Sequence, residues 1–178
     1  DYLKVVTELL VDDLKFLVES WEEKDGTFAK AFIKDDQALS KIMTALATLS
    51  GFELASERMA TALDSGDQED EHSCFSDNTH NDFIYNAKGI SQVYFNTGIA
   101  DLVEQKDTKL AKALKKQLHK TADLISDLPQ PIDREVLATE EGSKSRTQME
   151  KAIKSLQKQA DLFKQAGTVL GIEVSINE

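Results

Sequence analysis

The apolar residues of this chain return every three or four positions over long stretches, and this spacing is the feature that most constrains its fold. Residues with such spacing share one face of an α-helix, and that face must pack against another element. The spacing predicts helices over residues 2–22, 36–64, about 81–95, 107–128 and 143–170. Only the tail GIEVSIN shows the two-residue alternation that is typical of a strand.

The breaks between these helices are short and contain residues that end helices. KDGT at 24–27, SGD at 65–67 and PQP at 129–131 interrupt the pattern, and Gly66 and Gly171 are predicted to cap two helices. Residues 132–142 are a predicted linker. Long amphipathic helices with short connections indicate an all-α protein, an up-and-down bundle of four to five long helices. At this length we expect one domain over residues 1–178.

The chain has a net charge of −11, and the first 104 residues carry 21 acidic and eight basic side chains. Nucleic-acid binding needs clustered Lys and Arg, so no nucleic-acid partner is expected. An acidic surface either attracts cations or is simply solvated. No apolar run has the length of a transmembrane segment. Because the sequence starts at Asp1, we expect either a removed leader or an upstream part of a longer protein.

Two carboxylates in LSGFELASERM, residues 49–59, are the first candidates for a functional site. Glu53 and Glu57 lie four residues apart and continue the apolar stripe of their helix, so we expect both to point toward the core or a crevice at its end. Arg58 lies beside them. Buried carboxylates need cations or hydrogen-bond donors, which indicates either a structural Glu–Arg network or a cation site built by facing helices. Gly51 indicates close packing or access for a ligand.

The second candidate is the acidic stretch, residues 64–80, with the sequence DSGDQEDEHSCFSDNTH. It has six Asp or Glu residues among its first fourteen, no Lys or Arg, and the only cysteine, Cys74. It does not fit an EF-hand, and the chain has no HEXXH. The stretch is therefore either a solvated loop or a source of cation ligands, and no catalytic residue is predicted. The candidate metal or ligand-binding residues are Glu53, Glu57, Glu71, His72 and Asp77, and the candidate supporting residues are Ser50, Gly51, Ser56, Arg58, Asp70, Ser73, Asn78 and His80.

Four segments resemble imelysin-like proteins, in particular the C-terminal half of iron-regulated protein A and its relatives. They are YLKVVTELLVDDLKFL (2–17), LSGFELASERM (49–59), the acidic stretch and NAKGI (86–90). The resemblance extends from residue 2 to about residue 170, and the acidic stretch is long and unusual enough to be specific.

The resemblance implies a helical fold of two bundle-like halves with a site between them, so one expected partner is the chain's own N-terminal half. The family's signature GXHXXE lies in that half and is absent from this chain, which puts peptidase activity in doubt. Residues 51–56, GFELAS, have a similar form, with Glu53 in place of the histidine and Ser56 in place of the glutamate. We therefore hypothesise that the two halves are distant duplicates.

Imelysin-like proteins are exported to the bacterial periplasm, often as lipoproteins, and are associated with iron uptake. The leading prediction is a periplasmic iron-uptake component whose acidic residues contribute to a site for iron or another divalent cation between two bundles. Since such proteins are often lipoproteins, a lipid anchor to a bacterial membrane in the full-length protein is a further expectation. The alternatives are an imelysin-type metallopeptidase, and a metal-free module that binds a polymer, an iron chelate or another iron-uptake protein. A single cysteine is either a small buried hydrophobe or has its partner outside this chain, and a pairing of Cys74 with an upstream cysteine is consistent with the oxidising periplasm that the resemblance implies.

Overall fold

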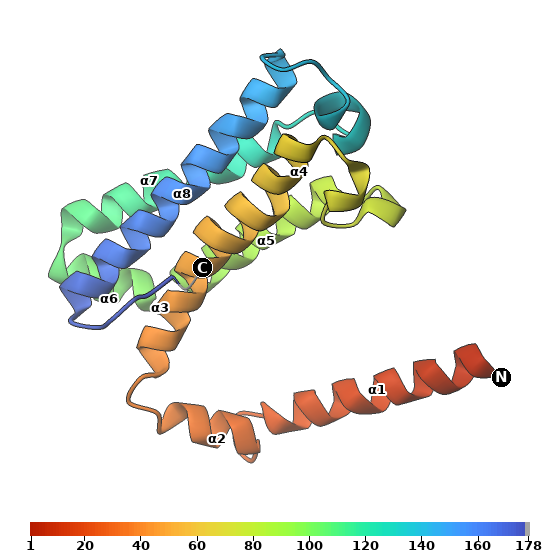
Figure 1. The fold of residues 1–178 in the computed structure, drawn as a ribbon. Coiled ribbons are helices and arrows are strands. Elements are labelled where there is room, and N and C mark those ends of the chain that lie inside the picture. The colour runs from red at the N-terminus through yellow and green to blue at the C-terminus, as the bar shows by residue number, and fades with distance from the viewer. Residues whose placement is uncertain (177–178) are drawn as a thin grey trace. The chain divides into compact units, whose positions relative to one another are not determined.

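The computed structural model describes residues 1–176 and consists of helices joined by short connections (Figure 1). No strand occurs among these residues, so the predicted all-α class is confirmed. The chain divides into two compact units, Asp1–Leu39 and Ser40–Glu178. That the whole chain forms one domain stays a prediction.

The smaller unit contains α1, Tyr2–Ser20, and α2, Thr27–Ile33. The first predicted helix is confirmed, whereas α2 was not predicted, because its seven residues are too few to show a helical period. Trp21 joins the two helices through ring contacts with Phe28 and Phe32, at centroid distances of 6.1 and 5.7 Å. Several apolar side chains of α1 are more than half exposed, among them Leu3, Leu10 and Leu14.

The larger unit is built around α8, Lys144–Leu170, which packs against α7 and against a composite helix that runs from α3 through η1 to α4 (Figure 1). Within η1 the composite helix is wound as a π-helix, and η4 is a short π-helical turn, whereas η2 and η3 are 3₁₀ turns. The remaining bounds are α3, Ala38–Thr48; η1, Leu49–Ala60; α4, Thr61–Ser65; η2, Gln68–Asp70; η3, Cys74–Ser76; α5, Thr79–Asn96; α6, Ile99–Lys106; α7, Thr108–Ser126; and η4, Asp133–Leu137.

The long helices of this unit agree with the prediction to within about three residues at most ends. Gly66 and Gly171 cap α4 and α8 in the left-handed conformation, with φ of 67° and 74°. Three details differ from the sequence-based expectation. The short α6 was not predicted, the linker at 132–142 contains η4, and the tail over 172–176 has no strand, with Asn177 outside the described residues.

Apolar side chains from the composite helix, α5, α7, η4 and α8 form the core of this unit. The most deeply buried of them are less than 2% exposed and include Leu54, Met59, Phe83, Ile125, Met149 and Leu156. Two buried polar residues of α8 connect it to its neighbours. Gln159 Nε2 donates to Ser50 Oγ of η1 at 2.9 Å, and Ser155 Oγ accepts from Gln117 Nε2 of α7 at 2.7 Å. These hydrogen bonds fix the register of α8 against both helices.

Gly51 lies at the closest approach of η1 to α8. A Cβ atom at this position would meet the Cβ of Ala160 at 2.8 Å and Ile176 Cδ1 of the tail at 3.6 Å. Of the two interpretations of Gly51 from the sequence, close packing is therefore the one that the structure supports.

We expect Gly51→Ala to destabilise the protein by about 1–3 kcal/mol, because the added methyl group overpacks the contact with Ala160. Gly89→Ala is the matched control. Gly89 also lies inside a helix, but a Cβ there meets nothing within 4 Å, so alanine should stabilise by about 0.5–1 kcal/mol through helix propensity. Urea unfolding of both variants measures the difference, and equal effects at the two sites would contradict the packing role.

Candidate functional site

The segment LSGFELASERM lies within η1 and is wound as a π-helix. In this segment hydrogen bonds join residues five apart: the Thr61 amide and the Ser56 hydroxyl donate to the carbonyls of Ser56 and Gly51. Residues four and five apart are neighbours in such a winding, and Glu53 pairs with Arg58, with Oε2 and Nη2 3.9 Å apart. π-helical segments are rare and often occur at functional sites.

The Glu53 pocket is a cavity of about 130 Å³ beside this ion pair. Three elements contribute to it: η1, the acidic stretch and α5. Its lining residues are Leu49, Glu53, Leu54, Arg58, His72 and Asn86. The structure thus brings together Glu53, Arg58 and His72, three residues that the sequence singled out in two separate segments.

His72 carries the most distinctive atom of the Glu53 pocket. Its Nδ1 is buried and has no hydrogen-bond partner among the described residues, while its ring lies 6.4 Å from that of Phe83. A buried polar atom without a partner is costly unless water or a ligand satisfies it. The pocket therefore offers a carboxylate, a guanidinium and an unsatisfied imidazole to a ligand.

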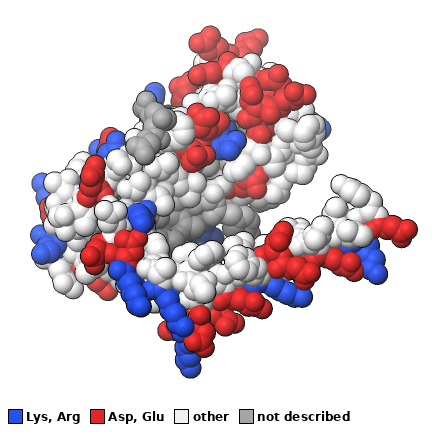
Figure 2. Space-filling view, turned by 60° about the horizontal axis from the view of Figure 1, so that its bottom comes forward, with Lys and Arg blue, Asp and Glu red and all other residues white. Residues whose placement is uncertain are grey.

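Hydrogen bonds inside the acidic stretch hold His72 in place. The Ser73 amide donates to Thr79 Oγ1 at 3.2 Å, and the Ser73 hydroxyl donates to the Asp82 carboxylate of α5. On the other side of the loop, Gln68 Nε2 donates to Asp77 Oδ1 at 3.2 Å. Figure 2 shows Asp and Glu side chains gathered at the end of the larger unit where this stretch lies. The stretch is thus a structured loop with a charged outer surface.

Glu71 is the exception in this stretch, because its carboxyl is buried. It is 7% exposed, and its Oε1 has no hydrogen-bond partner among the described residues. Burial is the largest effect and raises the pKa of Glu71, the hydrogen bond with Thr79 comes next and lowers it, and the nearby carboxylates of Asp133 and Asp77 raise it by smaller amounts. His80 is buried as well, and burial lowers its pKa.

Several predicted residues have positions that differ from the expectation. Glu57 is exposed and does not line the Glu53 pocket, so the prediction that it points with Glu53 toward the core or a crevice is wrong. The charged partner of Glu53 is instead Arg58, the fifth residue on. Ser50 lies in the core, where it bonds Gln159 and the Leu46 carbonyl.

The other candidates of the acidic stretch lie at its surface or support the loop. Asp70, Asp77 and Asn78 are exposed, Ser73 is half-buried, and Cys74 is half-buried as a free thiol. Asn78 precedes α5 but its side chain makes no cap hydrogen bond to the helix. Two residues near the candidate site residues were not predicted. Asn86 lines the Glu53 pocket and Asp133 lies near Glu71, and both are brought there only by the tertiary fold.

The donors of this chain do not by themselves complete a metal site. Among residues 1–176, no three His, Cys, Asp or Glu side chains lie close enough together to hold one ion. Glu53 and His72 supply two donors, and the positive charge of Arg58 next to Glu53 opposes a bare cation at this position. Any ion at the Glu53 pocket would need donors from a chelating ligand or from outside the chain.

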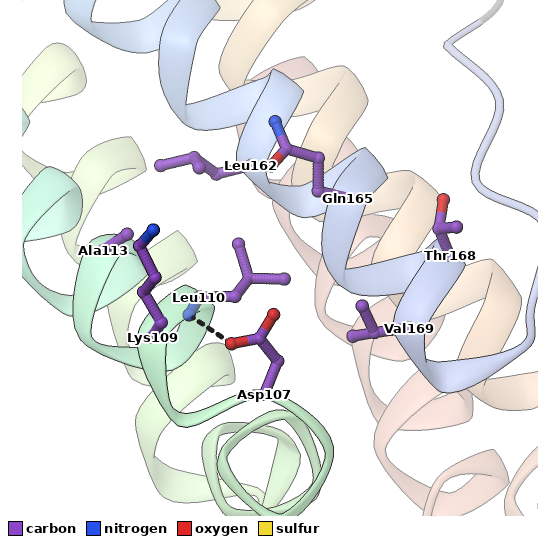
Figure 3. A pocket seen from close by; sticks show the side chains of 8 residues that line it. All are labelled: Asp107, Lys109, Leu110, Ala113, Leu162, Gln165, Thr168 and Val169. Carbon is purple, nitrogen blue, oxygen red and sulfur yellow. Dashed lines mark hydrogen bonds between the residues drawn. The ribbon is translucent and has the colours of Figure 1, made fainter.

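A larger cavity, of about 430 Å³, lies between the first turns of α7 and the last turns of α8 (Figure 3). Its walls are mostly apolar, and none of the predicted site residues lines it. Its only carboxylate, Asp107, is turned back to accept a hydrogen bond from the Leu110 amide at 2.9 Å and so caps α7. This cavity offers less chemistry than the Glu53 pocket.

Comparison with known protein families gives one finding for this chain. The family model described as Imelysin, Peptidase_M75, matches residues 1–163. No match is found among curated proteins. None of the helices among residues 1–176 has the length and apolarity that crossing a membrane requires.

The buried carboxyl of Glu71 makes a pH-dependent contribution to stability. Its pKa is raised in the folded state, so folding disfavours the charged form, and the penalty grows as the pH rises from the ordinary value of 4.5 through the folded-state pKa. We expect Glu71→Gln to raise the melting temperature at neutral pH and to leave it nearly unchanged well below 4.5.

Thermal unfolding at several pH values, from well below 4.5 to neutral, measures the change in melting temperature. Glu69→Gln is the control, because Glu69 lies two residues away and is exposed. A Glu71→Gln protein whose melting temperature falls equally at all pH values would show that the carboxylate is a required structural partner instead.

Proposed function

This chain belongs to the imelysin family, and from that membership we propose that it acts in the bacterial periplasm as a binding component of iron uptake. We propose further that the Glu53 pocket binds an anionic iron chelate. The observation that supports this assignment is the meeting of Glu53, Arg58 and the unpartnered Nδ1 of His72 around one cavity.

The charge of the pocket favours a chelate over a bare ion. Arg58 can pair with a carboxylate of the chelate through two parallel hydrogen bonds, and its guanidinium is nearly half exposed and thus available. Glu53 orients the guanidinium and offers an oxygen donor to the bound metal, and His72 offers an imidazole nitrogen. A chelate brings most of its own donors, which accounts for the small number that this chain supplies.

The size of the pocket bears on how the chelate would be held. A volume of about 130 Å³ is below the roughly 300 Å³ at which small-molecule pockets usually begin. The pocket would therefore take one edge of the chelate, and the rest would contact surfaces beyond it. A second, N-terminal half of the protein, as the resemblance implies, is our proposed source of those surfaces.

We expect Fe³⁺-citrate to bind saturably in calorimetric titration and Arg58→Gln to weaken that binding about tenfold or more, because a charged hydrogen bond is lost. His72→Ala should weaken it as well. Glu57→Gln is the matched control, since Glu57 lies on the same helix, is exposed and does not line the pocket.

The same titrations with Fe²⁺, Zn²⁺ and metal-free citrate separate the alternatives. Tight binding of the bare ions that Glu53→Gln abolishes and Arg58→Gln improves would replace the chelate by a cation as the ligand. Absence of Fe³⁺-citrate binding, or equal binding by wild type, Arg58→Gln and His72→Ala, would overturn the assignment of the pocket.

A further inference from the structure

A separate cavity lies where α5, α6 and α7 meet, away from the residues of the Glu53 pocket. Its volume is about 340 Å³, which falls in the range of roughly 300–1000 Å³ that is usual for small-molecule sites. Tyr94 and Phe95 of α5 form an aromatic wall, and the small side chains of Ala100 and Ala111 leave the space open. We refer to it as the Tyr94 cavity.

Tyr94 is the lining residue of this cavity that carries a buried polar atom, its hydroxyl. The residue is 1% exposed, and its hydroxyl has no hydrogen-bond partner among the described residues. Its ring is held between Phe95 and Phe163, at centroid distances of 5.0 and 5.8 Å, which fixes the position of the hydroxyl. Burial, together with the carboxylate of Glu104, raises the pKa of Tyr94 to about 12, so the hydroxyl keeps its proton as a donor.

Charges of opposite sign line the two sides of the opening. Asp101 and Glu104 lie three residues apart on α6, and Lys112 and Lys115 lie three residues apart on α7, so each pair shares one helix face. Asp107 alone separates the two helices in sequence. Within the part of the chain that the structure describes, none of these four side chains takes part in an ion pair.

Two opposite charged walls that do not neutralise each other are complementary to a ligand that carries both charges. A bare anion would be repelled by Asp101 and Glu104, and a bare cation by Lys112 and Lys115. The aromatic wall adds a preference for a ligand with an apolar part of modest size, and the Tyr94 hydroxyl is a donor without a partner among the described residues.

We propose that the Tyr94 cavity binds a small zwitterion, namely a free amino acid with an apolar side chain. The carboxylate faces Lys112 and Lys115 and accepts from the Tyr94 hydroxyl, and the ammonium group faces Asp101 and Glu104. The apolar side chain lies against the aromatic wall. This assignment is independent of the function proposed for the Glu53 pocket.

Leucine is the first probe, compared with isocaproate, which lacks its ammonium group, and isopentylamine, which lacks its carboxylate. We expect saturable binding of leucine by ligand-observed NMR and calorimetry, and about tenfold weaker binding or worse for either single-charge probe. No binding of leucine, or binding equalled by either single-charge probe, would overturn the proposal.

Substitutions of the lining residues test whether leucine binds in the Tyr94 cavity. Lys112→Gln with Lys115→Gln should weaken leucine about tenfold, whereas Lys116→Gln with Lys120→Gln, on the same helix but outside the cavity lining, should leave it unchanged. Tyr94→Phe removes only the hydroxyl and should weaken leucine by about fivefold with the helical circular dichroism intact. Leucine binding that survives both the Lys112/Lys115 and the Tyr94 changes would place the ligand elsewhere and contradict the assignment.

Discussion

The contact between η1 and α8 is the interaction on which the larger unit depends. At Gly51 the backbone of η1 lies so close to α8 that an added Cβ atom would be only 2.8 Å from the Cβ of Ala160. One residue earlier, Ser50 accepts a hydrogen bond from Gln159. Apolar packing provides most of the stability of such a contact, but the buried hydrogen bond selects one register. That register determines the direction in which Glu53 leaves the helix. The core packing and the pocket chemistry are therefore properties of the same few residues.

The position of the acidic stretch depends on the composite helix. It connects the end of the composite helix to α5 and folds its uncompensated charges outward, while Glu71 and His80 remain inside. Hydrogen bonds from Ser73 to Thr79 and Asp82 replace the regular hydrogen bonding that a loop lacks. The negative charge of the loop thus lies on its outer surface, while His72 of the same loop lines the Glu53 pocket.

Much of this architecture could be predicted from the sequence because it depends on local rules. The three-to-four spacing predicted the long helices, and glycine predicted two of their ends. The features that the sequence did not predict are two short helices and the π-helical winding of η1. α2 and α6 contain too few residues for a period to emerge, and the apolar spacing did not distinguish the π-winding of η1 from an α-helix. The expected pair of inward carboxylates is therefore replaced by an ion pair between Glu53 and Arg58.

The positions of unsatisfied polar atoms connect stability to function in this fold. His72 lines the Glu53 pocket, Tyr94 lines the cavity of α5, α6 and α7, and the carboxyl of Glu71 lies near that of Asp133. The other unsatisfied atoms among the described residues are His80 Nδ1, Asp133 Oδ1 and Gln159 Oε1. Each such atom lowers the stability of the folded state unless something outside the described side chains completes its hydrogen bonds. A core that needed only stability would place apolar groups there. Two of these atoms, His72 Nδ1 and the Tyr94 hydroxyl, belong to residues that line cavities with charged walls, and a ligand that completes their hydrogen bonds would stabilise the folded state there.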